Sequence, residues 1–408
     1  MKKLVRILIV ISFWSCNTDD NRQSETYTIA VPETLSKTEF RSSVVVENPK
    51  PILNVGKIYA YNDYIFINEK FKGVHVVDNS NPLAPHVVSF IKIPGNEDIS
   101  IKDNFLYADN AIDLVVFDLS NITSIHEVER LEDVFDVYDY RVPNDAVGID
   151  YSNFNAETDV IVGWTLEQRE GVYDEIGIFT SNDASALESG SVGVGGSLAR
   201  FQIVNDYLYT VGVEVMNVFN ISNLAQPNLV HTQYAGWNIE TMFHADGYLY
   251  LGGTNGMFIH SIENPALPQY ISNFNHWEGC DPVVVDDDYA YLTLRAGNEC
   301  GQELSVLEVI DVSDKFNPTL VAEHFLDNPY GLGFKNDRLF VCDGAAGLKI
   351  YDKTNPLDLQ LLSTFSNVNA TDVIPLEDRL LMISANALYQ YEYTSENSIE
   401  LISTFILN

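Results

Sequence analysis

The sequence predicts an all-β fold, a β-propeller built from four-stranded antiparallel blades. The stretch GVHVVDNSNPLAPHVVSF, which begins at Gly73, returns near the end of the chain as GLKIYDKTNPLDLQLLSTF, beginning at Gly347. Seven segments share this template of short apolar strands separated by turn residues, a pattern typical of all-β folds. No long stretch has the 3.6-residue period of an amphipathic helix, so helices should be scarce.

The first turn of each repeat sets the spacing of the template. These turns begin at Asn62, Asp103, Asn205, Asp246, Asp287, Asn336 and Glu377, with intervals of 41, 102, 41, 41, 49 and 41 positions. Asn and Asp tolerate the left-handed backbone of tight hairpins, and Pro in the recurring SNP-type turn ends the preceding strand. Four strands in about 41 residues fit one propeller blade, because neighbouring blades cover each other's apolar faces.

The two long intervals point to additions to the repeat. The interval of 49 contains RAGNECGQEL, an extension of the hairpin between a second and a third strand. The interval of 102 contains residues 136–195, which form either a degenerate eighth blade or a β insertion on a seven-bladed ring. We therefore expect a propeller over residues 41–408 with seven or eight blades, eight being favoured. Residues 41–53 are expected to add a strand where the ring closes.

The chain opens with the layout of an export signal. Lys2, Lys3 and Arg6 precede an apolar run over residues 4–14, which is too short to span a bilayer. We assign residues 1–15 to this signal and residues 16–40 to a polar, solvated tether. The pair Ser15-Cys16 resembles a bacterial lipoprotein lipobox, which implies cleavage before Cys16 and lipidation of that residue. The alternative is an ordinary signal peptide with a chance cysteine.

Two further resemblances concern the repeats and the cellular address. The strands DLVVFDLSN, VMNVFNISN, VLEVIDVSD and GVHVVDNSN resemble LVIVD repeats of exported bacterial proteins. That resemblance implies a propeller and almost nothing about activity. The acidic residues directly after Cys16 resemble the surface-export tag of lipoproteins of the Bacteroidetes type. They imply an outer-membrane lipoprotein at the cell surface, with the periplasmic face as the alternative.

The composition limits the possible partners. The chain has 58 acidic and 23 basic residues and a net charge of −35, which becomes more negative if the basic signal is removed. A field of this sign repels phosphate backbones, so nucleic acid is not an expected partner. It also repels anionic lipid surfaces, so the expected membrane attachment is the lipid on Cys16.

The cysteines and motifs indicate neither a metal nor a cofactor. Cys280 and Cys300 flank a predicted hairpin and are our candidate disulfide, since an exported chain meets an oxidising environment. Cys342 lies within an apolar strand and should be a buried, inert thiol. We find no CxxC pair, clustered histidines or catalytic signature. The Gly-rich stretch at 190–197 lacks a Lys and a following helix, so we interpret it as a loop.

The candidate ligand site lies at one mouth of the central channel. The loops from fourth to first strands and from second to third strands line that mouth. Charged residues that begin innermost strands are costly to bury, so Asp98, Arg200 and Asp372 should face a watery funnel. Exposed aromatic side chains beside them suit sugar or peptide recognition. The candidate ligand-binding residues are Asp98, Arg200, Trp237, Glu240, His276, Trp277 and Asp372. The alternative is loop packing, with charge pairs that tie the first strands together.

These observations favour a surface-anchored lipoprotein whose propeller is a binding or scaffold module for protein or glycan. The alternative is a polysaccharide-acting hydrolase or lyase that uses acidic residues at the funnel mouth, which requires two carboxylates at catalytic separation in a cleft. A salt-bridged mouth would count against that enzyme. A third possibility is a structural partner of an outer-membrane complex. Catalytic residues are not predicted.

Overall fold

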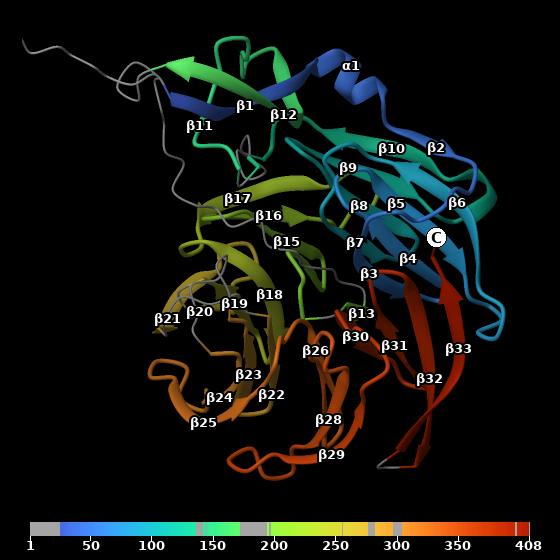
Figure 1. Ribbon diagram of the computed structural model, residues 1–408, viewed down its shortest axis with the longest axis vertical. Helices are drawn as coiled ribbons and strands as arrows, with labels where there is room; N and C mark the ends of the chain where they lie inside the picture. The colour runs from blue at the N-terminus through green and yellow to red at the C-terminus, as the bar shows by residue number, and fades with distance from the viewer. Residues whose placement is uncertain are drawn as a thin grey trace, which may run out of the picture.

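The computed structural model describes residues 25–407 except 136–141, 144, 172–193, 196, 255, 276–281, 297–303 and 396–397. Over these residues the chain is almost entirely strand, with one short helix, α1 (Lys37–Ser42), and a 3-10 turn at Ile122–Ser124. The described strands form eight sheets, and seven of them contain four consecutive antiparallel strands. These seven sheets are the blades of a propeller, arranged around a common centre in Figure 1.

Each blade is continuous in sequence. Blades 1 and 2 are β3 (Val55–Tyr61), β4 (Tyr64–Glu69), β5 (Gly73–Asp78) and β6 (His86–Lys92), then β7 (Ile99–Lys102), β8 (Phe105–Asn110), β9 (Asp113–Asp118) and β10 (His126–Leu131). Blades 3 and 4 are β14 (Phe201–Val204), β15 (Tyr207–Val211), β16 (Val215–Asn220) and β17 (Asn228–Tyr234), then β18 (Ile239–Ala245), β19 (Tyr248–Gly253), β20 (Gly256–Ser261) and β21 (Gln269–Asn275).

Blades 5 to 7 follow the same plan. Blade 5 is β22 (Val283–Asp286), β23 (Tyr289–Leu294), β24 (Val306–Asp311) and β25 (Thr319–Phe325). Blade 6 is β26 (Leu332–Lys335), β27 (Arg338–Cys342), β28 (Leu348–Asp352) and β29 (Gln360–Phe365), and blade 7 is β30 (Asp372–Pro375), β31 (Arg379–Ile383), β32 (Ala387–Ser395) and β33 (Ser398–Ile406).

The first strand of each blade lies innermost, and these strands close a ring. β7 contacts β14, and the contacts continue through β18, β22, β26 and β30 back to β3. Blades 1 and 2 are joined through the Tyr59 hydroxyl, which accepts a hydrogen bond from the Ile101 nitrogen at 2.6 Å. The predicted propeller of four-stranded blades is therefore confirmed. The favoured count of eight matches the number of described sheets, whereas the four-stranded blades of the ring number seven.

The eighth sheet lies outside the ring, at the top of Figure 1. This N-terminal sheet contains β1 (Glu25–Ser36), β11 (Gly148–Ile149) and β12 (Asp159–Gly171). Of the two interpretations of residues 136–195, the structure supports an insertion, because β7 and β14 touch directly. The predicted tether is wrong for residues 25–40: β1 pairs with β12 along its length and buries Ile29 and Ala30.

Blade 1 carries two additional strands, one at each edge. β2 (Val45–Glu47) pairs with β6 at the outer edge, and β13 (Val194–Gly195) pairs with β3 at the inner edge. The strand expected within residues 41–53 therefore exists, but it does not close the ring. Closure comes from side-chain packing between blades 1 and 7, where Ile58 and Ile374 share one apolar core, and from a backbone hydrogen bond that the Ile52 nitrogen donates to the Leu407 oxygen at 3.0 Å.

The turn chemistry follows the sequence pattern. The first residue of the first turn has a φ between 48° and 52° in six of the seven repeats, at Asn62, Asp103, Asn205, Asp246, Asp287 and Asn336. After the third strand, a carboxylate accepts hydrogen bonds from the residue two positions later. Asp78 accepts from the nitrogen of Ser80 at 2.9 Å and from its hydroxyl at 2.6 Å. These local bonds explain why Asp or Asn recurs at the end of that strand.

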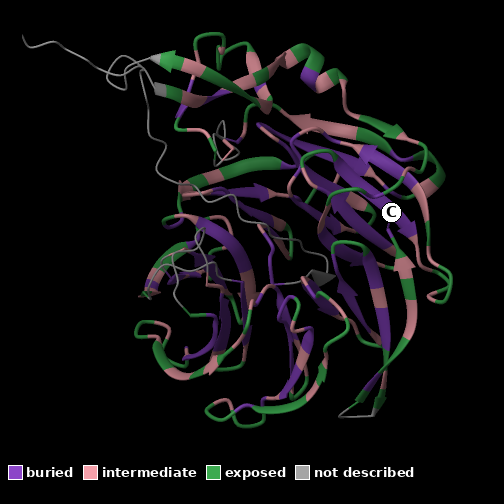
Figure 2. Cartoon of the chain, in the orientation of Figure 1, coloured by how far each residue is buried: buried purple, intermediate pink, exposed green. Residues whose placement is uncertain are grey.

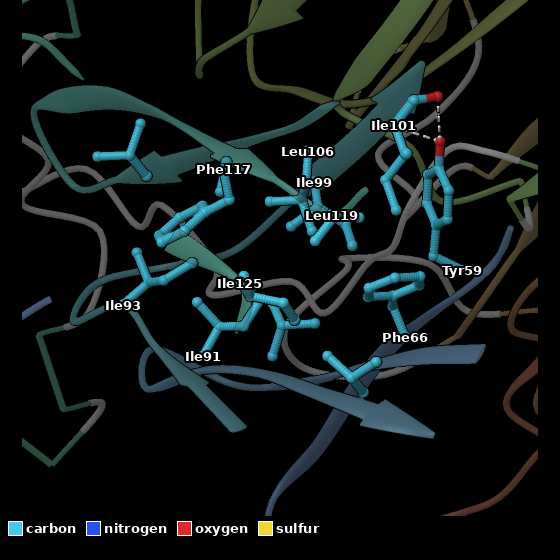
Figure 3. Packing of buried hydrophobic residues seen from close by; sticks show 14 of the residues in the cluster. Tyr59, Phe66, Ile91, Ile93, Ile99, Ile101, Leu106, Phe117, Leu119 and Ile125 are labelled. Carbon is cyan, nitrogen blue, oxygen red and sulfur yellow. Dashed lines mark hydrogen bonds between the residues drawn. The ribbon is translucent and has the colours of Figure 1, made fainter. Parts of the chain in front are cut away.

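The core lies between adjacent blades. Figure 2 shows buried residues concentrated on the inner strands, with exposed residues on the outer strands and turns. Figure 3 shows one such layer, in which Tyr59 and Phe66 of blade 1 pack against Ile99, Leu106 and Phe117 of blade 2. Each blade therefore buries both faces against its neighbours, as the repeat predicts.

Candidate functional site

The first residues of the innermost strands meet at one end of the channel. Because strands alternate in direction, the fourth-to-first and second-to-third connections of all blades lie at this mouth. Asp372 begins β30 of blade 7, Lys57 lies in β3 of blade 1, Asp98 directly precedes β7 of blade 2, and Arg200 directly precedes β14 of blade 3. Four neighbouring blades thus supply acidic and basic residues in alternation.

We call Asp372, Lys57, Asp98 and Arg200 the charged row, and Asp98 is at its centre. Its Oδ2 lies 3.2 Å from Lys57 Nζ and accepts backbone hydrogen bonds from Arg200 at 2.6 Å and Phe201 at 3.1 Å. Asp98 is only 1% exposed and Asp372 only 3%. The expectation that these two carboxylates face a watery funnel is therefore wrong. The structure instead has the alternative arrangement, charge pairs that tie the first strands together.

Burial dominates the protonation of this row. It raises the pKa of Asp372 to about 7, opposed by the hydrogen bond from the Val373 nitrogen and by the charge of Lys57. Burial also raises the pKa of Asp98 and lowers the pKa of Lys57, and each charge opposes the shift of the other. Asp372 Oδ2 has no hydrogen-bond partner in the described part of the chain.

A carboxylate that sequence reasoning missed holds Asp98 in place. Asp109, at the end of β8, accepts hydrogen bonds from the backbone nitrogens of Glu97 at 2.9 Å and Asp98 at 2.7 Å. The side-chain amide of Asn96 donates to the same Oδ1 at 2.8 Å. Burial raises the pKa of Asp109 to about 7. Its signal in the sequence was an Asp inside the apolar second strand, a costly place for an unpaired charge.

The remaining predicted site residues divide into two groups. The Arg200 guanidinium pairs with Glu97 Oε2 at 2.8 Å and donates to the backbone oxygen of Glu240 at 3.4 Å, and Glu240 is 7% exposed. Trp237 is 46% exposed, between Gly236 (φ 154°) and Asn238 (φ 47°). His276, Trp277, Cys16, Cys280 and Cys300 lie outside the described residues. Cys342 is a free, buried thiol as predicted, and burial raises its pKa.

The chain itself occupies the channel. β13 pairs Val194 with Ala60 and Gly195 with Tyr59, on the inner edge of β3. Beyond it, Ser197 Oγ accepts a hydrogen bond from the Leu332 nitrogen of blade 6 at 2.8 Å. The Ala199 oxygen accepts one from the Met242 nitrogen of blade 4 at 2.5 Å. We call Val194–Gly195 with Ser197, Leu198 and Ala199 the channel segment; its bonds link it to blades 1, 6 and 4.

A second basic group at the mouth was not identified from the sequence. The Arg295 guanidinium lies over the ring of Tyr330, 4.3 Å from its centroid. Arg295 follows β23 in blade 5, and Tyr330 precedes β26 in blade 6, so both belong to connections that line the mouth. Its only sequence signal is an Arg at the start of the extended hairpin RAGNECGQEL, which does not reveal the stacking partner.

Metal-binding clusters and membrane-spanning helices are absent from the described residues. Within the described ranges, no group of three or more His, Cys, Asp or Glu residues is placed to hold a metal ion. No helix in those same ranges is long and apolar enough to cross a membrane.

The repeats match a known family. The sequence profile of the LVIVD repeat matches residues 54–91 and 96–133, which correspond to blades 1 and 2. Two blades of the propeller are therefore LVIVD repeats. No curated protein sequence matches the chain significantly.

Solved structures share the fold at low sequence identity. A protein from Lactobacillus plantarum has a TM-score of 0.53 and 9% identity, covering 86% of this chain and 95% of its own. The periplasmic gluconolactonase PpgL of Pseudomonas aeruginosa has a TM-score of 0.51 and 10% identity, covering 87% and 96%. The computationally designed protein Ika8 has a TM-score of 0.52 and 9% identity, covering 88% of each chain. At these identities the likeness concerns the fold alone.

Proposed function

We propose that this protein is a binding or scaffold module that holds a protein or glycan ligand at the mouth of its propeller. The observation that carries the proposal is Trp237, an aromatic side chain that is 46% exposed in the connection between β17 and β18. Large aromatic side chains contribute much of the energy at binding surfaces, because they bury area with little loss of conformational freedom. The channel segment bonds to blades 1 and 6 below the mouth, which supports a ligand that lies on the mouth rather than one that threads the channel.

The test is a binding screen with a matched pair of variants. The purified full chain is applied to glycan and peptide arrays, and the affinity for each hit is measured by calorimetry. Trp237→Ala should weaken binding about tenfold or more, as expected for a central aromatic contact. Phe316→Ala, which removes a 69% exposed aromatic from a third-to-fourth turn at the opposite end of the blades, should leave the affinity unchanged. Arrays without hits, or equal effects of the two variants, refute the proposal.

We also propose attachment to the outer membrane through lipid on Cys16, with the propeller at the cell surface. The supporting feature is the basic and apolar start that ends at Ser15-Cys16, followed by acidic residues. Labelled fatty acid should enter the full chain in cells and not its Cys16→Ala variant, because a thiol is required for the thioether. Protease added to intact cells then separates the two faces: cleavage supports the cell surface, and protection supports the periplasmic face.

One observation favours the alternative, a hydrolase or lyase acting on polysaccharide. The pKa of Asp372 is about 7, raised first by burial, and its free oxygen Oδ2 would suit a proton donor. However, a polysaccharide would have to reach a carboxyl group that is 3% exposed, beside Asp98 at 1%. A reducing-end assay decides the matter: turnover that disappears in Asp372→Asn would establish the enzyme, and inactivity on a broad polysaccharide panel would remove it.

A further inference from the structure

Arg295 differs from the arginines of the structure that form ion pairs. Carboxylates pair with Arg41, Arg130, Arg169, Arg200 and Arg379. Within the described residues, Arg295 makes no ion pair and no hydrogen bond, and its guanidinium lies over the ring of Tyr330. In a chain with 58 acidic and 23 basic residues, a partly exposed guanidinium without a carboxylate is conspicuous. Its donors are available to a ligand.

The ring beneath Arg295 is fixed by the surrounding strands. The Tyr330 nitrogen donates to the Cys342 oxygen at 2.7 Å, and the Tyr330 oxygen accepts from Thr293 Oγ1 at 2.6 Å. The side-chain amide of Asn328 donates to the Tyr330 hydroxyl at 3.3 Å. These bonds tie the aromatic platform to β23 and β27. A guanidinium stacked on it is oriented in advance, so less conformational entropy is lost when a ligand binds.

Gly344 allows this platform to form. A Cβ at Gly344 would lie 3.1 Å from Asn328 Nδ2 and 3.2 Å from Tyr330 Cε2, closer than ordinary contact. Gly344 also has a φ of 52°, which favours glycine. The connection between β27 and β28 is therefore shaped around the Asn328–Tyr330 pair. Arg295, Asn328, Tyr330 and Gly344 thus form one group, which comes from three connections at the mouth.

We propose that this group binds a saccharide that ends in a single carboxylated sugar, with Arg295 holding the carboxylate. A planar guanidinium matches a carboxylate with two parallel hydrogen bonds. The net charge of −35 argues against a polyanion, because each further negative charge is repelled by the protein. A saccharide is favoured over a peptide because Trp237, 46% exposed in another connection at the same mouth, carries a flat apolar ring of the kind that packs against sugar C–H groups. The inference rests on the proposed binding function and names its ligand class.

The experiment compares the binding of a carboxylic acid with that of its uncharged methyl ester. The full chain is titrated calorimetrically with a neutral-backbone tetrasaccharide ending in glucuronate, and with the same tetrasaccharide as its methyl ester. We expect the free acid to bind about tenfold more tightly or better, the range for charge-assisted hydrogen bonds. Arg295→Gln should remove the preference and leave the affinity for the ester unchanged. Lys315→Gln, which removes an equal charge stacked on Tyr248 at 5.7 Å in a third-to-fourth turn, should keep the preference.

Each outcome separates this inference from the function on which it rests. Equal binding of acid and ester by the wild-type protein overturns the inference and leaves the binding function intact. A failure to bind any saccharide or peptide overturns both. Arg295-dependent binding of a peptide through its free C-terminal carboxylate, without binding of the glucuronate probe, overturns the saccharide class. Thermal unfolding of each variant establishes that it is folded, and Arg295→Lys, which keeps the charge, should retain part of the preference.

Discussion

At the scale of single residues, one buried aromatic side chain in the second strand of six of the seven blades packs between neighbouring blades; blade 7 has Leu381 at this position. Phe66, Tyr107, Tyr209, Tyr250, Tyr291 and Phe340 occupy this position, and each is at most 1% exposed. The Tyr107 hydroxyl donates to the Leu224 oxygen of blade 3 at 2.8 Å, and the Tyr209 hydroxyl donates to the Pro265 oxygen of blade 4 at 2.8 Å. The aromatic of the repeat therefore contributes apolar burial, and Tyr107 and Tyr209 add a hydrogen bond to the next blade.

Two tyrosines at the same repeat position provide a matched test of that bond. Tyr107→Phe should lower the free energy of unfolding by about 1 kcal/mol, because it removes the donor to a buried oxygen. Tyr250→Phe should be neutral or slightly stabilising, since the Tyr250 hydroxyl is buried without a hydrogen-bond partner among the described residues. Urea unfolding of both variants measures the difference. Equal losses of stability would show that the hydroxyl bond to Leu224 contributes nothing specific.

Asp372 should make stability depend on pH. Its pKa is about 7 in the folded protein, raised by burial above the ordinary value of 3.8. The folded state therefore binds this proton more tightly than the unfolded state does. The resulting stabilisation is complete below pH 3.8 and is lost as the pH rises through 7. Asn at this position is neutral at every pH and does not show this loss.

The Asp372→Asn variant tests this sign directly. Between pH 4 and 7, the stability of the variant minus that of the wild type should rise by up to about 1.4 kcal/mol per pH unit, and it should level off above pH 7. The similar shift of Asp109 is present in both proteins and cancels in the difference. Chemical unfolding at several pH values gives the curves. Parallel curves would mean that Asp372 is not the group that titrates.

At the scale of elements, local chemistry explains what the sequence could predict. The positive φ at Asn62 and the Asp78–Ser80 bonds depend on residues within a few positions, so the turns and strands could be recognised. The strand β1 could not, because its polar residues are ordered by β12, which lies more than 120 positions away. The same limit applies to the site. Single charges could be placed at the mouth, but the Lys57–Asp98 pair and the channel segment are contacts between distant parts of the chain.

The helix α1 fixes the N-terminal sheet to blade 2. Arg41 contacts both oxygens of Asp113, at 2.8 and 3.0 Å, and Asp113 is fully buried. Arg41→Ala should lower stability by about 1–3 kcal/mol, because Asp113 keeps Arg130 but loses one charged partner. Lys37→Ala removes a more exposed pair with Asp133 and should cost less than about 1 kcal/mol.

Hydrogen exchange distinguishes local release from global unfolding in these two variants. The amides of β1 should exchange faster in Arg41→Ala, while those of blades 4 to 6 keep their protection. Lys37→Ala should exchange like the wild type throughout. Unchanged protection of β1 in Arg41→Ala would show that pairing with β12 alone holds the N-terminal sheet.

At the scale of the whole molecule, the ring closes without a strand shared between its first and last blades. Each of blades 1 and 7 is continuous in sequence, so their contact depends mainly on side chains. One backbone hydrogen bond, from the Ile52 nitrogen before blade 1 to the Leu407 oxygen after blade 7, adds to it at 3.0 Å. Apolar packing around Ile58 and Ile374 supplies one part of it. The charged row supplies another, since Lys57 of blade 1 lies between Asp98 of blade 2 and the electrostatically coupled Asp372 of blade 7. Removing the cation should therefore affect three blades together.

Lys57→Met provides the test of this closure. It keeps the length of the side chain but leaves two buried carboxyl groups without their cation, so stability at pH 8 should fall by about 3–5 kcal/mol. Adding Asp98→Asn removes one of the two unpaired buried charges. Because the two residues interact directly, the double variant should be more stable than Lys57→Met alone, with a coupling above about 1 kcal/mol. If the two substitutions lower the free energy of unfolding additively in urea, the charged row does not contribute to closure, and apolar packing closes the ring.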